Sequence, residues 1–198
     1  METIAKASPR RWARIAGAFY LLTFVTGALS AAFVGGKLAG YGDAANLIAT
    51  GCYVAVTVLF YYLFKPVSRT IALLAALFGL VGCALGALGV FHLTPVPINS
   101  LVFFGCYCLV IGYLTLRSTF LPRILGALMM FAGFGWLTFL SVPLASHLSP
   151  YNLVPGLVGE GSLTLWLLVI GVNAPRWTAQ AGAAERPSAT FAPEAVEQ

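Results

Sequence analysis

Glu160 combines reactive chemistry with an unusual setting, because it is the only charged residue well inside an apolar stretch of the sequence. Its neighbours in the run Val158-Gly159-Glu160-Gly161-Ser162 are small, so they leave room for water, a ligand or another helix. A carboxyl group can accept hydrogen bonds or act as a general acid or base. If the stretch is a membrane-spanning helix, Glu160 lies roughly 14 Å from its outer end, close to the bilayer midplane. An ionisable residue at that depth usually marks a functional site.

Other polar residues could share a site with Glu160. Gly156 and Thr164 lie four residues before and after it, which places them on the same face of a helix. Thr23, Tyr53 and Tyr107 lie within other apolar stretches. We therefore predict a ligand site formed by Glu160, Gly156, Thr164, Tyr107, Tyr53 and Thr23. The alternative is that Glu160 forms a structural hydrogen bond to a neighbouring helix.

No motif identifies a catalytic, metal or cofactor site. The sequence contains no nucleotide-binding glycine loop, no HExxH pair and no GxSxG elbow. His92 and His147 supply too few ligands for a metal site. The cysteines lie inside apolar runs, which indicates small packing residues rather than metal ligands; they are Cys52, Cys83, Cys106 and Cys108. We therefore predict no catalytic residue, no metal and no cofactor.

The composition indicates which elements must position the polar residues. Hydrophobic residues make up 60% of the 198 positions and charged residues only 9%, whereas soluble domains carry about 25% charge. A spanning helix needs about 20 mainly apolar residues. Six stretches qualify: 13–34, 44–64, 70–92, 98–116, 120–142 and 151–172. We expect an all-α integral membrane bundle in a single domain, 1–177, followed by a disordered cytoplasmic tail, 178–198, which is rich in Ala, Glu and Pro.

The basic residues predict the orientation of these helices. Lys37 is the one basic residue expected on the outer side, and the others lie before, between or after the helices on the inner side. This asymmetry places both termini in the cytoplasm of a prokaryotic inner membrane. A cleaved signal peptide would also begin with basic residues, but the apolar run 15–34 is long for one. The basic residues form no cluster suited to nucleic acid, so we expect membrane lipids as partners.

Small residues and arginines predict how the bundle packs and meets lipid. One stripe follows the third predicted helix, and a second follows the fourth; small residues allow helices to approach closely in a membrane. The first stripe consists of Ala72, Ala75, Gly79, Gly82, Gly86 and Gly89, and the second of Gly105, Cys108, Gly112 and Thr115. Arg117 and Arg123 flank the connection between the fourth and fifth helices, where they could bind lipid phosphates or only set the topology.

Three stretches resemble the DUF4386 family of multi-spanning prokaryotic membrane proteins: 14–23, 112–126 and 159–171. The run Arg-Ser-x-Phe-Leu-Pro-Arg-x-Leu-Gly at 117–126 is the most specific of them. The resemblance extends to about Trp177, and it implies the architecture without implying a reaction. The chain departs from the family pattern in its short connection from Leu93 to Ile98. Tyr107 stands where many relatives have His, so no role resting on that His is implied.

Three functions fit the sequence. The first is a binder or carrier of a small hydrophobic molecule or lipid, with a polar pocket around Glu160. The second is an accessory protein with a structural role, which assembles with another membrane protein. The third is an intramembrane enzyme that uses Glu160 as an acid or base, although no second catalytic group is evident. A cavity would favour a carrier, and small-residue stripes facing lipid would favour an accessory subunit.

Overall fold

A computed structural model describes residues 8–33, 38–93 and 99–185, which are helical and contain no strand. Six helical segments are long and apolar enough to span a membrane, which confirms the predicted all-α bundle. The α-helices are α1 (Pro9–Ala32), α2 (Ala39–Phe64), α3 (Arg69–Val90), α4 (Ser100–Arg117), α5 (Arg123–Leu137), α6 (Val142–Leu148), α7 (Val154–Val169) and α8 (Ala174–Glu185). Two short 3-10 helices, η1 (Thr138–Leu140) and η2 (Tyr151–Leu153), flank α6.

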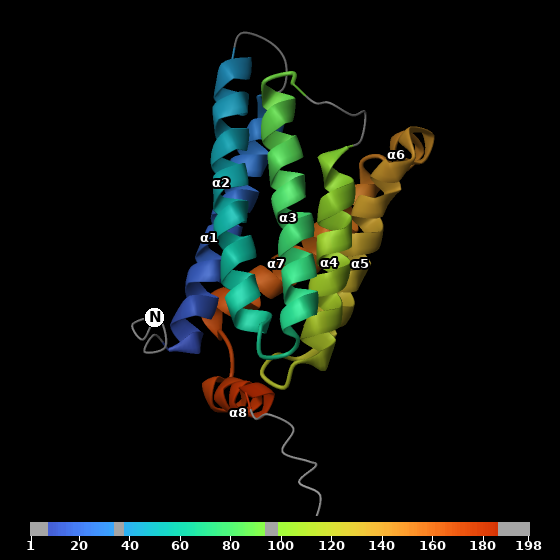
Figure 1. Cartoon of the computed structure of the whole chain (residues 1–198). Coiled ribbons are helices and arrows are strands. Elements are labelled where there is room, and N and C mark those ends of the chain that lie inside the picture. Colours follow the sequence, from blue (N-terminus) through green and yellow to red (C-terminus); the bar gives the residue numbers. More distant parts are fainter. Residues whose placement is uncertain (1–7, 34–37, 94–98, 186–198) are drawn as a thin grey trace, which may run out of the picture.

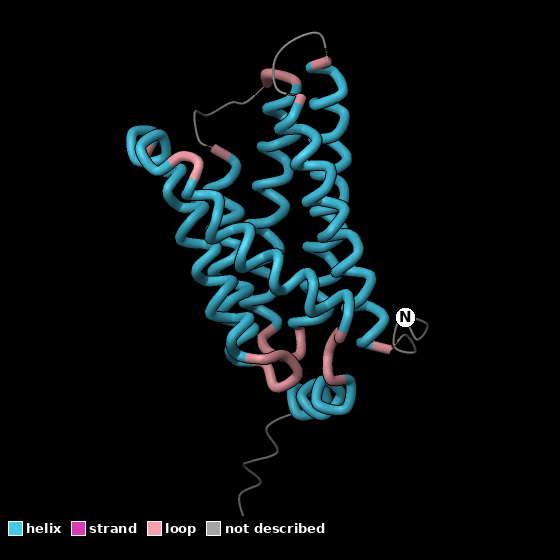
Figure 2. Tube along the Cα trace, turned by 180° about the vertical axis from the view of Figure 1, so that it is seen from behind, coloured by secondary structure: helices cyan, strands magenta, loops and turns pink. Residues whose placement is uncertain are grey.

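Helices α1 to α5 run up and down the bundle, and α7 crosses them obliquely (Figures 1 and 2). Each of these five helices contacts the next along the chain, while α7 contacts α5 and α1 and so joins the two sides. One end of the bundle, here called the basic end, carries the described Lys and Arg residues. They are Arg10, Arg11, Arg14, Lys65, Arg69, Arg117, Arg123 and Arg176.

The structure moves the boundaries of the last two predicted spans. The fifth begins at Arg123 rather than at residue 120, because Pro122 is extended with a ψ of 133° and serves as the N-cap. The sixth ends at Val169 rather than at residue 172. Gly171 has a φ of 76°, and its N–H donates to the carbonyl of Trp166 at 3.0 Å. A residue in this left-handed conformation terminates a helix, and glycine adopts it without strain. Two other predicted end residues, Val34 and Ile98, lie outside the described residues.

Helix α8 corrects the predicted tail. The sequence predicts disorder from Thr178, but residues 178–185 continue the helix that begins at Ala174. Asn173 accepts a hydrogen bond from the backbone N–H of Arg176 at 3.2 Å. The indole N–H of Trp177 donates to the carbonyl of Leu63 at 2.8 Å, which attaches α8 to the end of α2. The Ala and Glu residues that, with Pro, suggested a disordered tail are also good helix formers. The rest of the predicted tail, 186–198, lies outside the described residues.

Glycines bring α4 and α5 into backbone contact. Gly105 faces Gly133 and Gly112 faces Gly126, two turns apart on each antiparallel helix. A Cβ atom added at Gly112 would lie 2.7 Å from the carbonyl oxygen of Gly126, and one added at Gly126 would lie 2.7 Å from that of Gly112. These four residues are called the glycine seam below. Gly105 and Gly112 belong to the predicted stripe of the fourth helix and pack as predicted.

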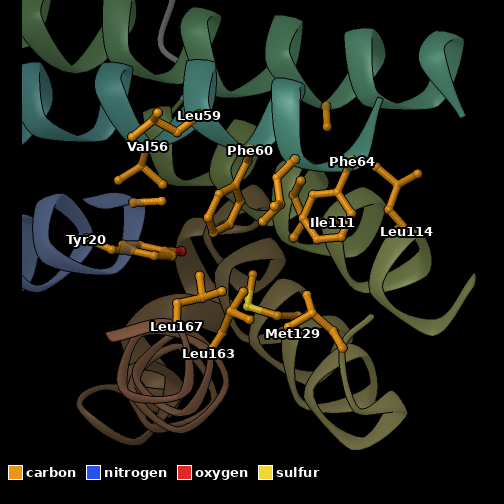
Figure 3. Close-up of a cluster of buried hydrophobic side chains, with 14 of the residues drawn as sticks. Tyr20, Val56, Leu59, Phe60, Phe64, Ile111, Leu114, Met129, Leu163 and Leu167 are labelled. Carbon is orange, nitrogen blue, oxygen red and sulfur yellow. The ribbon is translucent and has the colours of Figure 1, made fainter. Parts of the chain in front are cut away.

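The small residues of α3 make room for aromatic side chains. A Cβ atom at Gly79 would lie 3.2 Å from the Tyr107 ring, and one at Gly82 would lie 3.0 Å from the Phe104 ring. Both rings belong to α4 and point inward. Large apolar side chains of α2, α4, α5 and α7 fill the neighbouring core, and Tyr20 points from α1 into the same cluster (Figure 3). The α3 stripe thus positions Tyr107, one of the predicted site residues.

Candidate functional site

Glu160 is buried at the centre of the last span. The span covers the 19 residues Tyr151–Val169, and Glu160 lies at its midpoint with 4% of its surface exposed. Its Oε2 atom accepts a hydrogen bond from the hydroxyl of Tyr20 on α1. Its Oε1 atom accepts a hydrogen bond from the indole N–H of Trp136 on α5. One carboxyl group therefore joins three helices, α1, α5 and α7.

Two further tyrosines complete a polar group in the middle of the bundle. Tyr53 of α2 lies edge-on to Tyr20, with ring centroids 5.5 Å apart, and its ring centroid is also 5.5 Å from that of Tyr107 on α4. The three tyrosines thus form a row of neighbouring rings that begins at the hydrogen bond between Tyr20 and Glu160. The set of polar side chains called the Glu160 cluster below consists of Tyr20, Tyr53, Tyr107, Trp136, Glu160 and Thr164.

Three hydroxyls of this cluster have no hydrogen-bond partner among the described protein groups. They belong to Tyr53, Tyr107 and Thr164, all buried. Nearly all buried polar atoms in proteins are paired, and leaving one unpaired costs about 1–3 kcal/mol. Tyr53 and Tyr107 lie on α2 and α4, in the row of neighbouring rings that begins with Tyr20, and Thr164 lies one turn after Glu160 on α7. The cluster has more hydrogen-bonding capacity than its own members use.

Gly156 allows Trp136 to reach Glu160. It lies one turn before Glu160 on α7, and the indole of Trp136 lies directly against it. A Cβ atom at this position would lie 2.7 Å from Cε2 and 3.1 Å from Nε1 of the indole. Any larger residue would push the ring away from Oε1 of Glu160. Gly156 therefore acts on the site by positioning Trp136 rather than by binding a ligand directly.

The structure brings together most of the predicted site residues. Glu160, Tyr53, Tyr107 and Thr164 meet in the cluster, as their depth in the spans suggests. Thr23 does not join them, because its hydroxyl donates to the carbonyl of Phe19 in its own helix at 3.0 Å.

Sequence reasoning missed Tyr20 and Trp136, the two residues that donate to the carboxyl group. Their position in the sequence could have identified them. Tyr and Trp in membrane proteins are enriched at the interfaces, whereas Tyr20 lies in the interior of α1 and Trp136 in the last turn of α5, short of the end of its span. When such a residue is buried, its O–H or N–H usually has a partner.

Among the described residues, two cavities lie at the ends of the bundle, and no member of the Glu160 cluster lines either of them, so neither supplies the cavity at Glu160 that would favour a carrier. The first, of about 530 Å³, lies between the start of α4, η1, α6 and η2 and is called the α6 cavity below. Its lining includes Phe139, whose ring centroid is 6.2 Å from that of Trp136. Trp136 therefore neighbours both a residue that lines this cavity and Glu160. The second cavity, of about 470 Å³, lies at the basic end and is lined in part by Arg10 and Arg176.

The arginines at the basic end fall into two kinds. Arg10 and Arg14 of α1 donate to the carbonyls of Ile170 and Val169 at 3.1 and 3.0 Å, so they cap the end of α7. Positive charge there also interacts favourably with the negative end of the α7 dipole. Arg117 and Arg123 are exposed at the ends of α4 and α5, and the Arg117 guanidinium lies 5.8 Å from the centre of the Tyr113 ring. That exposure is compatible with the predicted contact with lipid headgroups.

The sequence matches a domain of unknown function, DUF4386, over residues 15–101 and 98–171. The chain belongs to this family. The two matched parts meet near the connection that the sequence analysis identifies as short, and every residue of the Glu160 cluster lies within them. An uncharacterised protein of Archaeoglobus fulgidus is 28% identical over 127 residues, which cover 60% of this chain and 76% of that protein. No solved structure matches the chain. DUF4386 membership agrees with a multi-pass membrane protein and assigns no ligand.

Proposed function

We propose that this DUF4386 protein binds or carries a small molecule or lipid, and that the Glu160 cluster is its polar binding site. The observation that carries the proposal is that three buried hydroxyls without a partner belong to the same polar cluster as a buried carboxyl group. A purely structural polar group is expected to satisfy itself, because each unpaired atom lowers stability. A ligand that bonds to Tyr53 and Tyr107 would supply the missing partners.

Variants that remove only these hydroxyls test the proposal. Tyr53→Phe and Tyr107→Phe keep the rings and delete the oxygen atoms, and Glu160→Gln keeps the size of the side chain. Tyr113→Phe is the matched control, because Tyr113 lies on the same helix as Tyr107 but is exposed at 41%. Native mass spectrometry of protein purified with its own membrane lipids should detect a small molecule bound to the wild type and to Tyr113→Phe. The amount should fall in the three cluster variants. Equal amounts in wild type and Glu160→Gln would reject the cluster as the site.

A structural role in a larger assembly is the second candidate. It is favoured by the two hydrogen bonds through which Glu160 joins α1, α5 and α7. In that case Glu160→Gln would have little effect on the function of the protein. The partner would be another membrane protein. Most of the α3 stripe argues against it, since Ala72, Ala75, Gly79 and Gly82 are buried inside the bundle. Gly86 is half-buried and Gly89 is exposed at the end of the helix. A docking surface for a second subunit would leave such a stripe accessible.

We also infer that the basic end faces the cytoplasm and that the membrane is the prokaryotic inner membrane. The described Lys and Arg residues gather at that end, as the positive-inside rule requires of cytoplasmic loops. A reporter enzyme that is active only in the periplasm, fused to the C-terminus, should be inactive. High activity of the full-length fusion would show that the C-terminus lies in the periplasm, which is the opposite orientation.

A further inference from the structure

We propose that the Glu160 cluster binds a lipophilic organic cation, an amine or an onium ion carrying aromatic or alkyl groups, which reaches it from the α6 cavity past Trp136. This inference rests on the proposed function and names its substrate class. Three observations carry it: a carboxyl group without a described cationic partner, a set of aromatic rings around it, and a cavity without described charged lining residues whose Phe139 lies beside Trp136.

The first observation is that Glu160 has no counter-ion. Its two described partners are a hydroxyl and an indole N–H, both neutral donors. Every described Lys and Arg lies at the basic end, and the two histidines belong to the opposite end. A cationic ligand would supply the counter-charge for an ionised Glu160. An anionic ligand would instead be repelled by it.

The second observation is the nature of the groups around the carboxyl. Tyr20, Tyr53, Tyr107 and Trp136 are all aromatic, and Phe104 extends the set with a ring centroid 4.6 Å from that of Tyr53. Aromatic faces carry negative potential and attract ammonium groups, most strongly where water is excluded. Aromatic residues and a carboxylate together are the recognition chemistry of organic cations. The unpartnered hydroxyls can accept hydrogen bonds from an N–H of an amine.

The third observation is a route. The α6 cavity has a volume of about 530 Å³, within the range of roughly 300–1,000 Å³ that is usual for small-molecule sites. Its described lining contains polar but uncharged side chains, among them Asn99, Ser146 and Asn152, together with apolar ones. No cation in that lining would repel a positively charged ligand. The cavity is therefore suited to admit a molecule that is both apolar and cationic.

Trp136 neighbours both the lining of this cavity and Glu160. Its ring is tilted against that of Phe139, which lines the cavity, and its indole N–H donates to Glu160. Trp136 is only half-buried, and Gly156 leaves the space in which its ring lies. A rotation of the indole away from Glu160 would free Oε1 for the ligand. Trp136 is in this sense a positioning residue that lies on the access route.

Tetraphenylphosphonium tests the proposal, with tetraphenylborate as an anion of similar size and shape. Equilibrium dialysis against the full chain in lipid nanodiscs, with the uptake by empty nanodiscs subtracted, should show saturable binding of the cation and no saturable binding of the anion. Glu160→Gln should weaken cation binding on the order of tenfold or more, since it removes the charge. Asp43→Asn is the control, because it removes an exposed carboxylate near the start of α2 that belongs neither to the cluster nor to the lining of the α6 cavity, and it should bind like the wild type. Cation binding that does not saturate, or that is unchanged in Glu160→Gln, overturns the proposal.

A measurement on the wild type avoids any dependence on the folding of a variant. Dicyclohexylcarbodiimide is an apolar reagent for buried carboxyl groups, and peptide mass spectrometry locates its product. Tetraphenylphosphonium should slow the labelling of Glu160, and tetraphenylborate should not. Equal labelling with and without the cation contradicts the proposal. If a co-purified molecule is lost in Glu160→Gln while tetraphenylphosphonium never binds, the proposed function stands and only the cationic class is rejected.

Discussion

The glycine seam and the Glu160 cluster both join helices of the same bundle, and α4 contributes to both. In the seam, backbone meets backbone at Gly112 and Gly126, and no polar side chain takes part. In the cluster, long side chains from five helices meet around one carboxyl group, and three hydroxyls remain without partners. Close packing at small residues is sufficient to hold membrane helices together. The three unpartnered hydroxyls are not required for such packing, and as unpaired buried groups they lower stability. Their presence is therefore better explained by binding than by assembly.

The largest expected effect is the loss of the carboxyl group. Glu160→Leu leaves the Tyr20 hydroxyl and the Trp136 N–H buried without an acceptor, at about 1–3 kcal/mol each. The free energy of unfolding should fall by about 2–6 kcal/mol in a titration with SDS in mixed micelles. Glu160→Gln keeps an acceptor oxygen and should lose less than half as much. A Leu variant as stable as the wild type would show that the cluster contributes nothing to the fold.

The next effect tests the seam. Gly112→Ala places a Cβ atom 2.7 Å from the Gly126 carbonyl oxygen, so α4 and α5 must separate. Such overpacking should lower the free energy of unfolding by about 1–3 kcal/mol in the same titration. Gly161→Ala is the matched control, because a Cβ atom there meets nothing within 4 Å. The control should be neutral or slightly stabilising, by up to about 1 kcal/mol. Equal effects at the two positions would mean that the seam is no closer than an ordinary helix contact.

The third effect has the opposite sign and separates the two regions most clearly. Tyr107→Phe removes a buried hydroxyl that has no described partner, so the empty protein should gain about 1 kcal/mol of stability. Thermal unfolding in the absence of added ligand measures this gain against Tyr113→Phe, which should change little. A destabilised Tyr107→Phe variant would mean that the hydroxyl is paired in the membrane.

The smallest effect concerns the residues at the basic end of the seam. Arg117 ends α4 and Arg123 begins α5, and we propose that both bind anionic lipid headgroups at about 1 kcal/mol each. Replacing both by Gln should reduce the thermal stabilisation that phosphatidylglycerol gives to the protein in nanodiscs. The contribution of the glycine seam to stability should not depend on the charge of the lipid. Unchanged stabilisation would leave the two arginines with a topological role alone.

The sequence was sufficient to predict the spans and to single out Glu160, the central residue of the candidate site. Hydropathy identifies the spans because the bilayer core sets their length, and Glu160 is conspicuous because a charge at that depth is rare. Tyr20 and Trp136 escaped notice because each is mostly an apolar ring with one polar atom, which resembles a packing residue. Their convergence on Glu160 depends on the rotation of α1 and the oblique path of α7. Packing between helices sets such angles, and the pattern of one sequence does not contain them.

The hydrogen bond from Tyr20 to Glu160 joins residues 140 positions apart, and Arg10 and Arg14 of the first helix hold the last carbonyls of α7. These contacts bear on biogenesis. Chains are made from the N-terminus, so α1, α2 and α4 enter the membrane before α7 has been synthesised. Until α7 docks, the hydroxyl of Tyr20 has no carboxylate to meet and the cluster does not exist. A nascent chain arrested before α7 would therefore keep its glycine seam but expose unsatisfied polar groups, which is a defect that membrane proteases could recognise. The site therefore assembles only after the last span has been synthesised and has docked.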